Sequence, residues 1–224
     1  MNCEDKQSHK NKSTFTADSL VTKQGQKKTK AIDSLPVKKQ REYPLLSSKN
    51  AMEFFLQYEK EHKENKVRLV TDFGNIDILL FNETKFHRAN FIYLTKQGYF
   101  ENTQFYRVIE NYIIQGGSTD DRKVMKKRTK IGKYLLPTDT KRGFRHDKGV
   151  ISMPSSDIDN PYKLASPYEF FITLSNQYQL DGDYTIFGRV ISGLDVANKI
   201  AEVETDDADW PLQNVYIKTV EILE

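Results

Sequence analysis

Between residues 105 and 117, polar residues interrupt two short apolar runs in a pattern typical of paired strands. Apolar side chains alternate with a period near two around Arg107, which indicates a β-strand. A Glu-Asn pair at 110–111 marks a turn, and the second run ends at Gln115 and a glycine pair at 116–117. Two antiparallel strands joined in this way can direct Arg107 and Gln115 to one face. An arginine in a strand is usually a solvated edge residue, so the pattern alone does not establish a site.

A second pattern, with apolar residues at helical spacing, covers residues 50–65. Asn50 followed by Glu53 resembles a capping box and predicts that a helix begins here. The apolar stripe of this helix consists of Met52, Phe55 and Tyr58. We expect the stripe to pack on the outside of the domain that follows, as an N-terminal extension; a helix that binds a partner is the alternative.

The composition of residues 1–49 does not predict a folded domain. They contain eleven Lys or Arg and five Asp or Glu, few large apolar side chains and no sustained periodicity. Too little apolar surface is available to offset the entropy of ordering this stretch, so we expect a disordered basic tether at 1–49. The whole chain has a net charge of +3, so the rest of the chain is slightly acidic and is not a basic nucleic-acid module.

Cys3 is the only cysteine, so no intrachain disulfide can form. A cysteine so close to the N-terminus, followed by acidic residues and a long polar linker, resembles the anchor of a bacterial lipoprotein. The sequence contains no recognisable signal peptide and no apolar run long enough to span a membrane. Two locations stay open: the cell envelope, with an anchor through a lipidated Cys3, or the cytoplasm.

Motifs for metals and nucleophiles are weak in this sequence. The four histidines have no ligand-like spacing with one another or with the cysteine, so we expect no metal site and no cofactor. An acidic cluster at 157–160 lacks the glycine and the glutamate that a calcium loop needs at its sixth and twelfth positions. No Ser-His-Asp or phosphate-binding motif occurs in a suitable strand-to-helix setting.

The segment 105–117 resembles the signature of the cyclophilin family. That signature has Phe-His-Arg and two apolar residues, then a short turn, an aromatic residue, two aliphatic residues and Gln-Gly-Gly. Tyr106 replaces the histidine here. Further resemblances follow in the family's order, at residues 67–81, 86–94, 148–153, 169–173, 180–190 and 193–196. The resemblance therefore identifies residues 66–224 as a cyclophilin-like isomerase domain.

The resemblance implies a mainly β fold, a closed eight-stranded antiparallel barrel capped by two helices at about 84–96 and 193–202. It also implies a peptidyl-prolyl cis-trans isomerase that acts on X-Pro bonds of proline-containing or unfolded polypeptides and assists protein folding. A catalytically weak peptide-binding module or chaperone with the same groove is the alternative. We expect a monomer that does not bind nucleic acid, and that meets a membrane only if Cys3 is lipidated.

The resemblance also implies roles for named side chains. Arg107 would be the catalytic residue, because a guanidinium stays charged and can donate to the proline nitrogen as the peptide bond twists. Gln115 would orient this guanidinium or the substrate carbonyl. The apolar slot for the proline ring would be lined by Tyr112, Ile113, Phe171 and Leu180.

Five positions expected to bind substrate differ from the residues common in the family. Pro154 and Ser155 replace Ala-Asn, and proline offers no N–H donor. Gln179 stands where many members carry tryptophan, and Tyr184 where many carry histidine. Glu169 replaces glutamine, and we expect its carboxylate to lie near enough to Arg107 to pair with it.

Overall fold

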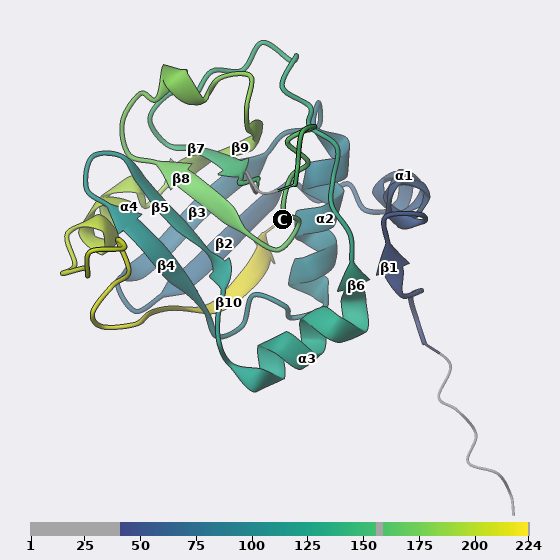
Figure 1. Ribbon diagram of the computed structural model, residues 1–224, viewed down its shortest axis with the longest axis horizontal. Coiled ribbons are helices and arrows are strands. Elements are labelled where there is room, and N and C mark those ends of the chain that lie inside the picture. The colour runs from purple at the N-terminus through teal and green to yellow at the C-terminus, as the bar shows by residue number, and fades with distance from the viewer. Residues whose placement is uncertain (1–40, 156–158, 224) are drawn as a thin grey trace, which may run out of the picture. The chain divides into compact units, whose positions relative to one another are not determined.

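Eight antiparallel strands close into a barrel, in the order β10-β2-β3-β9-β7-β8-β5-β4 (Figure 1). The computed structural model describes residues 41–155 and 159–223, and the barrel belongs to the compact unit Glu42–Glu224. The strands of the barrel are β2 (Lys66–Thr71), β3 (Gly74–Leu80), β4 (Thr103–Ile109), β5 (Ile113–Ser118), β7 (Val150–Met153), β8 (Phe170–Thr173), β9 (Thr185–Ser192) and β10 (Val215–Leu223). The predicted closed barrel is confirmed.

Alternate side chains of the strands fill the barrel. Every second residue of β2 and β3 is buried, among them Val67, Leu69 and Ile76. Aromatic rings extend this core, and Phe91 stacks on Phe100 with ring centroids 4.6 Å apart. Burial of each such side chain contributes about 1.5–3 kcal/mol, so the alternation read from the sequence is also what stabilises the barrel.

Two helices cap the barrel where the sequence predicts them. They are α2 (Lys85–Lys96) and α4 (Leu194–Ala201), and each agrees with its predicted range, 84–96 or 193–202, to within one residue at either end. Both present several buried apolar residues, and both ranges were implied by the family resemblance.

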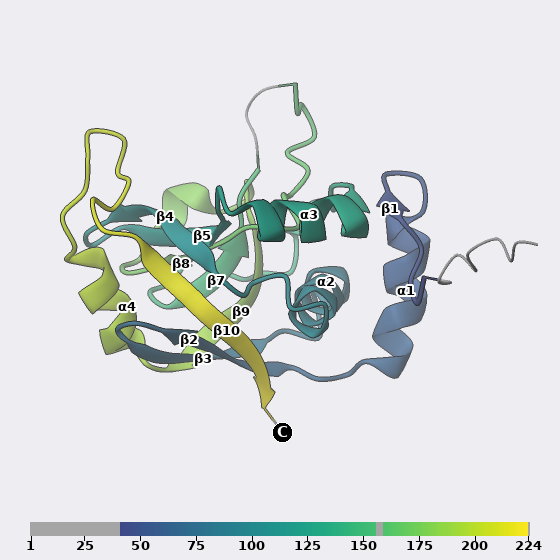
Figure 2. The same cartoon turned by 90° about the horizontal axis from the view of Figure 1, so that it is seen from below.

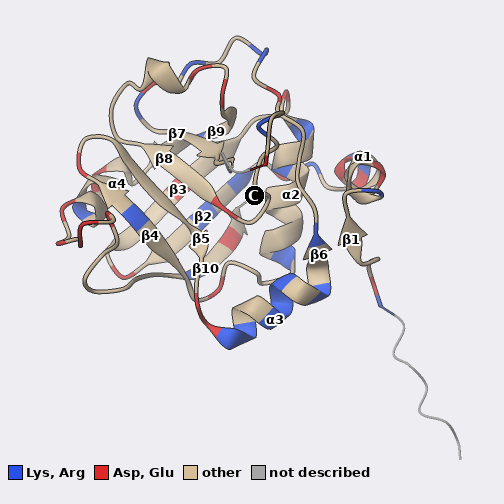
Figure 3. Cartoon of the chain, in the orientation of Figure 1, with Lys and Arg blue, Asp and Glu red and all other residues tan. Residues whose placement is uncertain are grey.

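A third helix, α3 (Arg122–Ile131), is absent from the sequence-based predictions. Asp121 caps it, since its carboxylate accepts hydrogen bonds from the backbone N–H groups of Lys123 and Val124 at 2.6 and 3.1 Å. Lys and Arg residues gather along this helix (Figure 3), and only Val124 and Ile131 are buried. Two buried residues are too few to give the helical period that would have predicted it.

Helix α1 (Ala51–Glu61) begins where the sequence predicts, but its predicted capping box is wrong. The Asn50 side chain accepts a hydrogen bond from the backbone N–H of Ser47 at 2.7 Å, so it closes the preceding turn. Glu53 accepts a hydrogen bond from Gln57 at 2.8 Å and does not reach back to Asn50. The helix packs against α2, on the side that faces away from the barrel (Figure 2).

Residues 42–49 also belong to the folded unit, so the predicted tether is too long at its C-terminal end. Strand β1 (Leu46–Ser47) pairs in parallel with β6 (Gly132–Lys133), and Leu46 is buried. A Cβ atom at Gly132 would lie 1.9 Å from the Leu46 carbonyl oxygen, so this pairing needs glycine. A two-residue strand carries no readable period, which explains why the sequence pattern did not predict it.

Residues 1–40, including Cys3, lie outside the described part of the chain, so the tether and the lipid anchor stay predictions. Within residues 41–155 and 159–223, no helix is long and apolar enough to cross a membrane. No group of three or more His, Cys, Asp or Glu side chains in these same ranges is arranged to hold a metal ion.

Candidate active site

Arg107 lies on β4, directly opposite Gln115 of β5, where the pairing of the two strands is irregular. Phe105 pairs with Gly116 and Arg107 with Gln115, so Tyr106 is an extra residue in β4. Such a bulge re-aims the side chains next to it. As a result Tyr106 and Arg107 both lie beside Gln115, although neighbours in a regular strand point to opposite faces.

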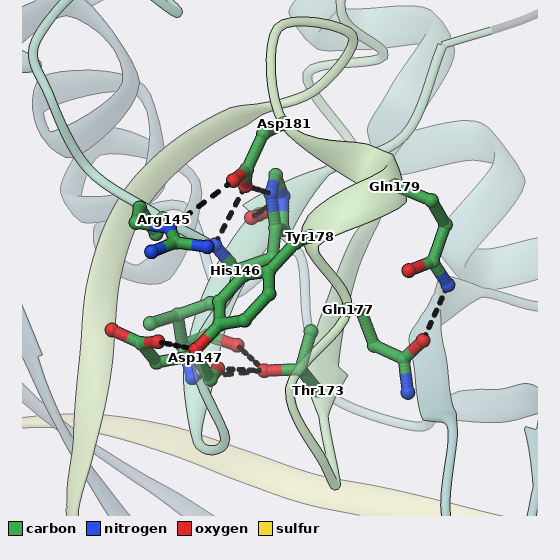
Figure 4. A network of polar contacts seen from close by, with 10 residues as sticks. Arg145, His146, Asp147, Thr173, Gln177, Tyr178, Gln179 and Asp181 are labelled. Atoms are coloured by element: carbon green, nitrogen blue, oxygen red, sulfur yellow. Dashed lines mark hydrogen bonds and ion pairs between the residues drawn. The ribbon is translucent and has the colours of Figure 1, made fainter.

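A cavity of about 210 Å³ opens beside Arg107. Nine of the predicted site residues line it: Arg107, Tyr112, Ile113, Gln115, Pro154, Ser155, Phe171, Leu180 and Tyr184. Two further predicted residues, Glu169 and Gln179, are not part of this lining. Gln179 lies in the short helix η1 (Tyr178–Leu180), where its amide group donates to Gln177 at 2.5 Å (Figure 4).

Aromatic side chains form one wall of the cavity. Phe171 meets Tyr184 edge to face, with ring centroids 5.5 Å apart, and its own ring is buried. The ring of His146 stacks behind Phe171 at a centroid distance of 6.0 Å. The wall is therefore a flat apolar surface of the kind that receives a small aliphatic ring.

His146 belongs to a buried polar network that supports this wall (Figure 4). Its Nδ1 lies 2.8 Å from Oδ1 of Asp181, and its Nε2 lies 3.1 Å from Oγ of Ser152. Burial lowers the pKa of His146, and the Asp181 carboxylate opposes this. Ser152 is fully buried as well, so this Ser-His-Asp arrangement offers no accessible nucleophile and holds Phe171 instead. The sequence analysis missed it, because the spacing of the three residues carries no signal.

Gln115 forms a hydrogen bond with Tyr106 and not with Arg107. Its side-chain amide donates to the Tyr106 hydroxyl, and no hydrogen bond joins it to the guanidinium in the described part of the chain. Burial raises the pKa of Tyr106, and the nearby Glu169 carboxylate raises it further. Of the two roles predicted for Gln115, orientation of the Arg107 guanidinium is therefore not seen.

The carboxylate that pairs with Arg107 belongs to Asp209, so the predicted ion pair with Glu169 is wrong. Arg107 Nε donates to Asp209 Oδ2 at 3.2 Å, and the two side chains are 43% and 40% exposed. Within residues 41–155 and 159–223, the terminal nitrogens of Arg107 donate no hydrogen bond. The sequence analysis missed Asp209, which lies 102 positions from Arg107 in a loop without a recognised motif.

Comparison with known proteins places this geometry in context. Residues 66–222 match the profile of the family described as "Cyclophilin type peptidyl-prolyl cis-trans isomerase/CLD". Peptidyl-prolyl cis-trans isomerase-like 2 of Rhizopus delemar is 35% identical over 167 residues, which are 74% of this chain and 30% of that protein. Peptidyl-prolyl cis-trans isomerase ppi1 of Schizosaccharomyces pombe is 35% identical over 153 residues, 67% of this chain and 94% of that protein. The chain thus spans about 30% of the length of the first relative and most of the second.

Solved structures give the same picture. The cyclophilin type peptidyl-prolyl cis-trans isomerase of Cryptosporidium parvum, in the presence of the dipeptide Ala-Pro, is 30% identical to this chain, with a TM-score of 0.60. The match covers 71% of this chain and 99% of that chain.

Proposed function

This chain belongs to the cyclophilin-type peptidyl-prolyl cis-trans isomerase family, and from that premise we propose that it accelerates rotation about X-Pro bonds in proline-containing or unfolded polypeptides. One observation carries the proposal: the Arg107 side chain is 43% exposed, lines a cavity with an aromatic wall, and donates no hydrogen bond from its terminal nitrogens to a described residue. The cavity would receive the proline ring, and Arg107 would act on the proline nitrogen.

The chemistry of the X-Pro bond explains why such a site suffices. The cis and trans forms differ by about 0.5–1 kcal/mol, but the partial double bond sets a barrier of about 18–20 kcal/mol. As the bond twists, the nitrogen loses conjugation and becomes a better hydrogen-bond acceptor. A guanidinium that donates to it then binds the twisted state more tightly than either planar state, which is the condition for catalysis. Arg107 stays charged and presents a rigid fork of donors, so it suits this role without a covalent step.

Other side chains of the cavity would hold the substrate. Ile113, Phe171 and Leu180 supply apolar contacts for the ring, and Tyr112 extends this surface. Gln115 gives one amide N–H to Tyr106, so its second N–H is available for the carbonyl group of the substrate. This is the second of the two roles predicted for Gln115.

A peptide-binding module with little catalytic power is the second candidate, and Pro154 favours it. Pro154 lines the cavity where the resemblance leads us to expect an alanine, and it cannot donate a backbone N–H to the substrate. A peptide held by fewer hydrogen bonds is oriented less well, which lowers catalysis more than it lowers apolar binding.

Exchange spectroscopy by NMR on a short peptide with one X-Pro bond distinguishes the two candidates. An isomerase brings cis and trans signals into exchange at a protein concentration far below that of the peptide, because it turns over. A module that only binds would shift the peptide signals in proportion to occupancy and leave the exchange rate unchanged. The second result would overturn the proposal.

The two locations predicted from Cys3, the cell envelope and the cytoplasm, stay proposals as well. Mass spectrometry of the protein purified from its native host measures whether Cys3 carries a lipid. A lipid mass on the N-terminal peptide supports the envelope, and an unmodified peptide supports the cytoplasm.

A further inference from the structure

The loop of residues 202–214, between α4 and β10, reaches β4 next to Arg107. Acidic residues gather on this loop (Figure 3). Its tip is held by its own hydrogen bonds, because Asp206 Oδ1 accepts from the backbone N–H groups of Ala208 and Trp210, each at 2.9 Å. The Asp206 backbone N–H also donates to the Trp210 carbonyl at 2.9 Å. The tip of the loop is therefore a closed turn.

This turn is attached to the bulge of β4 at two points. The Asp209 carbonyl accepts a hydrogen bond from the backbone N–H of Val108 at 2.9 Å. The ring of Trp210 packs on the ring of Tyr106, with centroids 5.7 Å apart. Asp209 has a φ of 64°, in the left-handed region that Asp, Asn and Gly tolerate best. The backbone thus fixes the point from which the Asp209 side chain projects toward Arg107.

The hydrogen bond between Arg107 and Asp209 uses only Nε, the inner nitrogen of the guanidinium. Nε donates to Asp209 at 3.2 Å, while Gln115, the other polar neighbour on β5, is occupied by Tyr106. Among the residues that the structure describes, Asp209 is the only polar side chain that holds the head of Arg107. All four N–H groups on the terminal nitrogens stay available.

We propose that Asp209 is the positioning residue of Arg107: it fixes Nε and so directs the terminal nitrogens to the cavity. The inference rests on the proposed isomerase function. A half-exposed ion pair contributes little to stability, so the contribution of Asp209 lies in orientation. Without it, the long arginine side chain samples several rotamers and must be ordered during each catalytic event. Binding of the proline ring depends on the apolar walls and not on this pair.

Two substitutions and one control test the proposal. Asp209→Gly removes the carboxylate and keeps a residue that accepts the left-handed backbone, so it adds no strain. Asp209→Asn keeps the size and one acceptor oxygen but removes the charge. Asp207→Asn removes the same charge from an exposed side chain of the same loop that makes no ion pair or side-chain hydrogen bond with a described residue.

We expect Asp209→Gly to lower kcat about tenfold, because a misplaced catalytic group costs one to two powers of ten, while KM stays within about twofold. Asp209→Asn should fall between this variant and the wild type, and Asp207→Asn should match the wild type. A loss confined to kcat distinguishes positioning from a general loss of fold. Wild-type kcat in Asp209→Gly would overturn the proposal, and a higher kcat would show that the pair restrains Arg107.

A second readout does not depend on turnover. The ¹⁵N–¹H signal of the Arg107 Nε–H group, assigned by its loss in Arg107→Lys, reports the hydrogen bond directly. We expect this signal to be present in the wild type and in Asp207→Asn. In Asp209→Gly we expect the signal to shift, or to disappear because the proton exchanges with solvent. An unchanged signal in Asp209→Gly would overturn the inference. If the wild type fails to isomerise peptides, the proposed function falls, and this signal still decides whether Asp209 holds Arg107.

Discussion

The chain carries two nearly identical tripeptides, Phe-His-Arg at 86–88 and Phe-Tyr-Arg at 105–107, in opposite environments. Arg88 lies within α2 and its side chain is 1% exposed, whereas Arg107 lies at the bulge of β4 and its side chain is 43% exposed. The first tripeptide has the residues of the cyclophilin signature, yet its His87 and Arg88 are buried. The tripeptide alone would select the wrong arginine; the strand pattern around Arg107, together with the Gln-Gly-Gly that follows it in the signature, selects Arg107.

The guanidinium groups of Arg88 and Arg107 also differ in how many of their N–H groups donate hydrogen bonds within the protein. Arg88 Nη1 donates to the backbone carbonyls of His62 and Glu64 at 2.9 and 3.1 Å, and its Nη2 lies 3.5 Å from Glu59. Arg107 donates one N–H to the Asp209 carboxylate, and its other four N–H groups make no hydrogen bond with a described residue. Spare donors beside a cavity are what a substrate can use, so these hydrogen bonds support the proposed role of Arg107 and indicate a structural role for Arg88.

The largest expected effect is on stability, from Arg88→Met. We expect a loss of about 2–5 kcal/mol in the free energy of unfolding, because the substitution leaves the carbonyls of His62 and Glu64 without these donors, and an unsatisfied buried group costs about 1–3 kcal/mol. Urea denaturation measures the loss, and isomerase activity per folded molecule should not change.

Arg68→Met is the matched control for Arg88→Met. Arg68 makes two hydrogen bonds to Asp77, at 2.7 and 2.9 Å, but on the barrel surface. Its loss should destabilise the protein far less than the loss of Arg88, because surface ion pairs contribute little to stability. Equal losses from the two substitutions would contradict the structural role assigned to Arg88.

His87, the neighbour of Arg88, predicts an acid limit to stability. It is fully buried, neither ring nitrogen has a partner among the described residues, and burial lowers its pKa from 6.5 to about 4. As the pH falls, His87 therefore becomes protonated at a higher pH in the unfolded state than in the folded state. Stability is complete above pH 6.5 and falls as the pH drops from there through 4, by about 3 kcal/mol.

The variant His87→Leu isolates this contribution from the carboxylates that titrate in the same range. The difference in unfolding free energy between pH 7 and pH 4 should be about 3 kcal/mol smaller in His87→Leu than in the wild type. Identical pH profiles of the two proteins would mean that His87 is hydrated or hydrogen-bonded in solution. His87 would then have a polar partner, as Tyr106 has in Gln115.

Arg107→Ala should affect activity strongly and stability little, which is the reverse of the effects expected for Arg88→Met. We expect kcat/KM for a proline peptide to fall by at least about 100-fold, or about 2.7 kcal/mol of transition-state stabilisation. The unfolding free energy should stay within about 0.5 kcal/mol of the wild type, since a half-exposed ion pair contributes little. Arg107→Lys should also be poor, because an ammonium group cannot reproduce the planar fork. Near-normal turnover of folded Arg107→Ala would refute the catalytic role.

The sequence predicted the parts of the molecule that depend on local pattern. Period-two alternation and the signature segment located β4, β5 and Arg107, helical spacing located α1, and the family resemblance located α2 and α4. Most of the cavity lining followed from the same resemblance. These features are encoded within a few residues of one another along the chain, where short-range periodicity and turn chemistry act.

The parts that escaped prediction depend on contacts between distant segments. Asp209 meets Arg107 across 102 positions, and His146 finds Asp181 across 35. Strand β1 exists because Gly132 lets the Leu46 backbone approach, which no local pattern signals. The family resemblance predicts that Glu169 pairs with Arg107. The structure shows that the carboxylate of Asp209, from a distant loop, pairs with Arg107 instead.

The smallest expected effect is that of Glu169→Gln. Glu169 lies near Tyr106 and forms no ion pair with Arg107, and a glutamine at 169 keeps an acceptor oxygen for the Tyr106 hydroxyl. Because the substitution leaves the guanidinium and its Asp209 contact unchanged, kcat/KM should change by less than about twofold, well below the effect of removing a group that stabilises the transition state. Steady-state assays of Glu169→Gln and Asp209→Gly in parallel measure the contrast. A severalfold rise in Glu169→Gln alone would mean that Glu169 competes for Arg107 in solution. The Arg107 guanidinium would then have two anionic partners and fewer N–H groups left for a substrate. In this respect Arg107 would resemble Arg88.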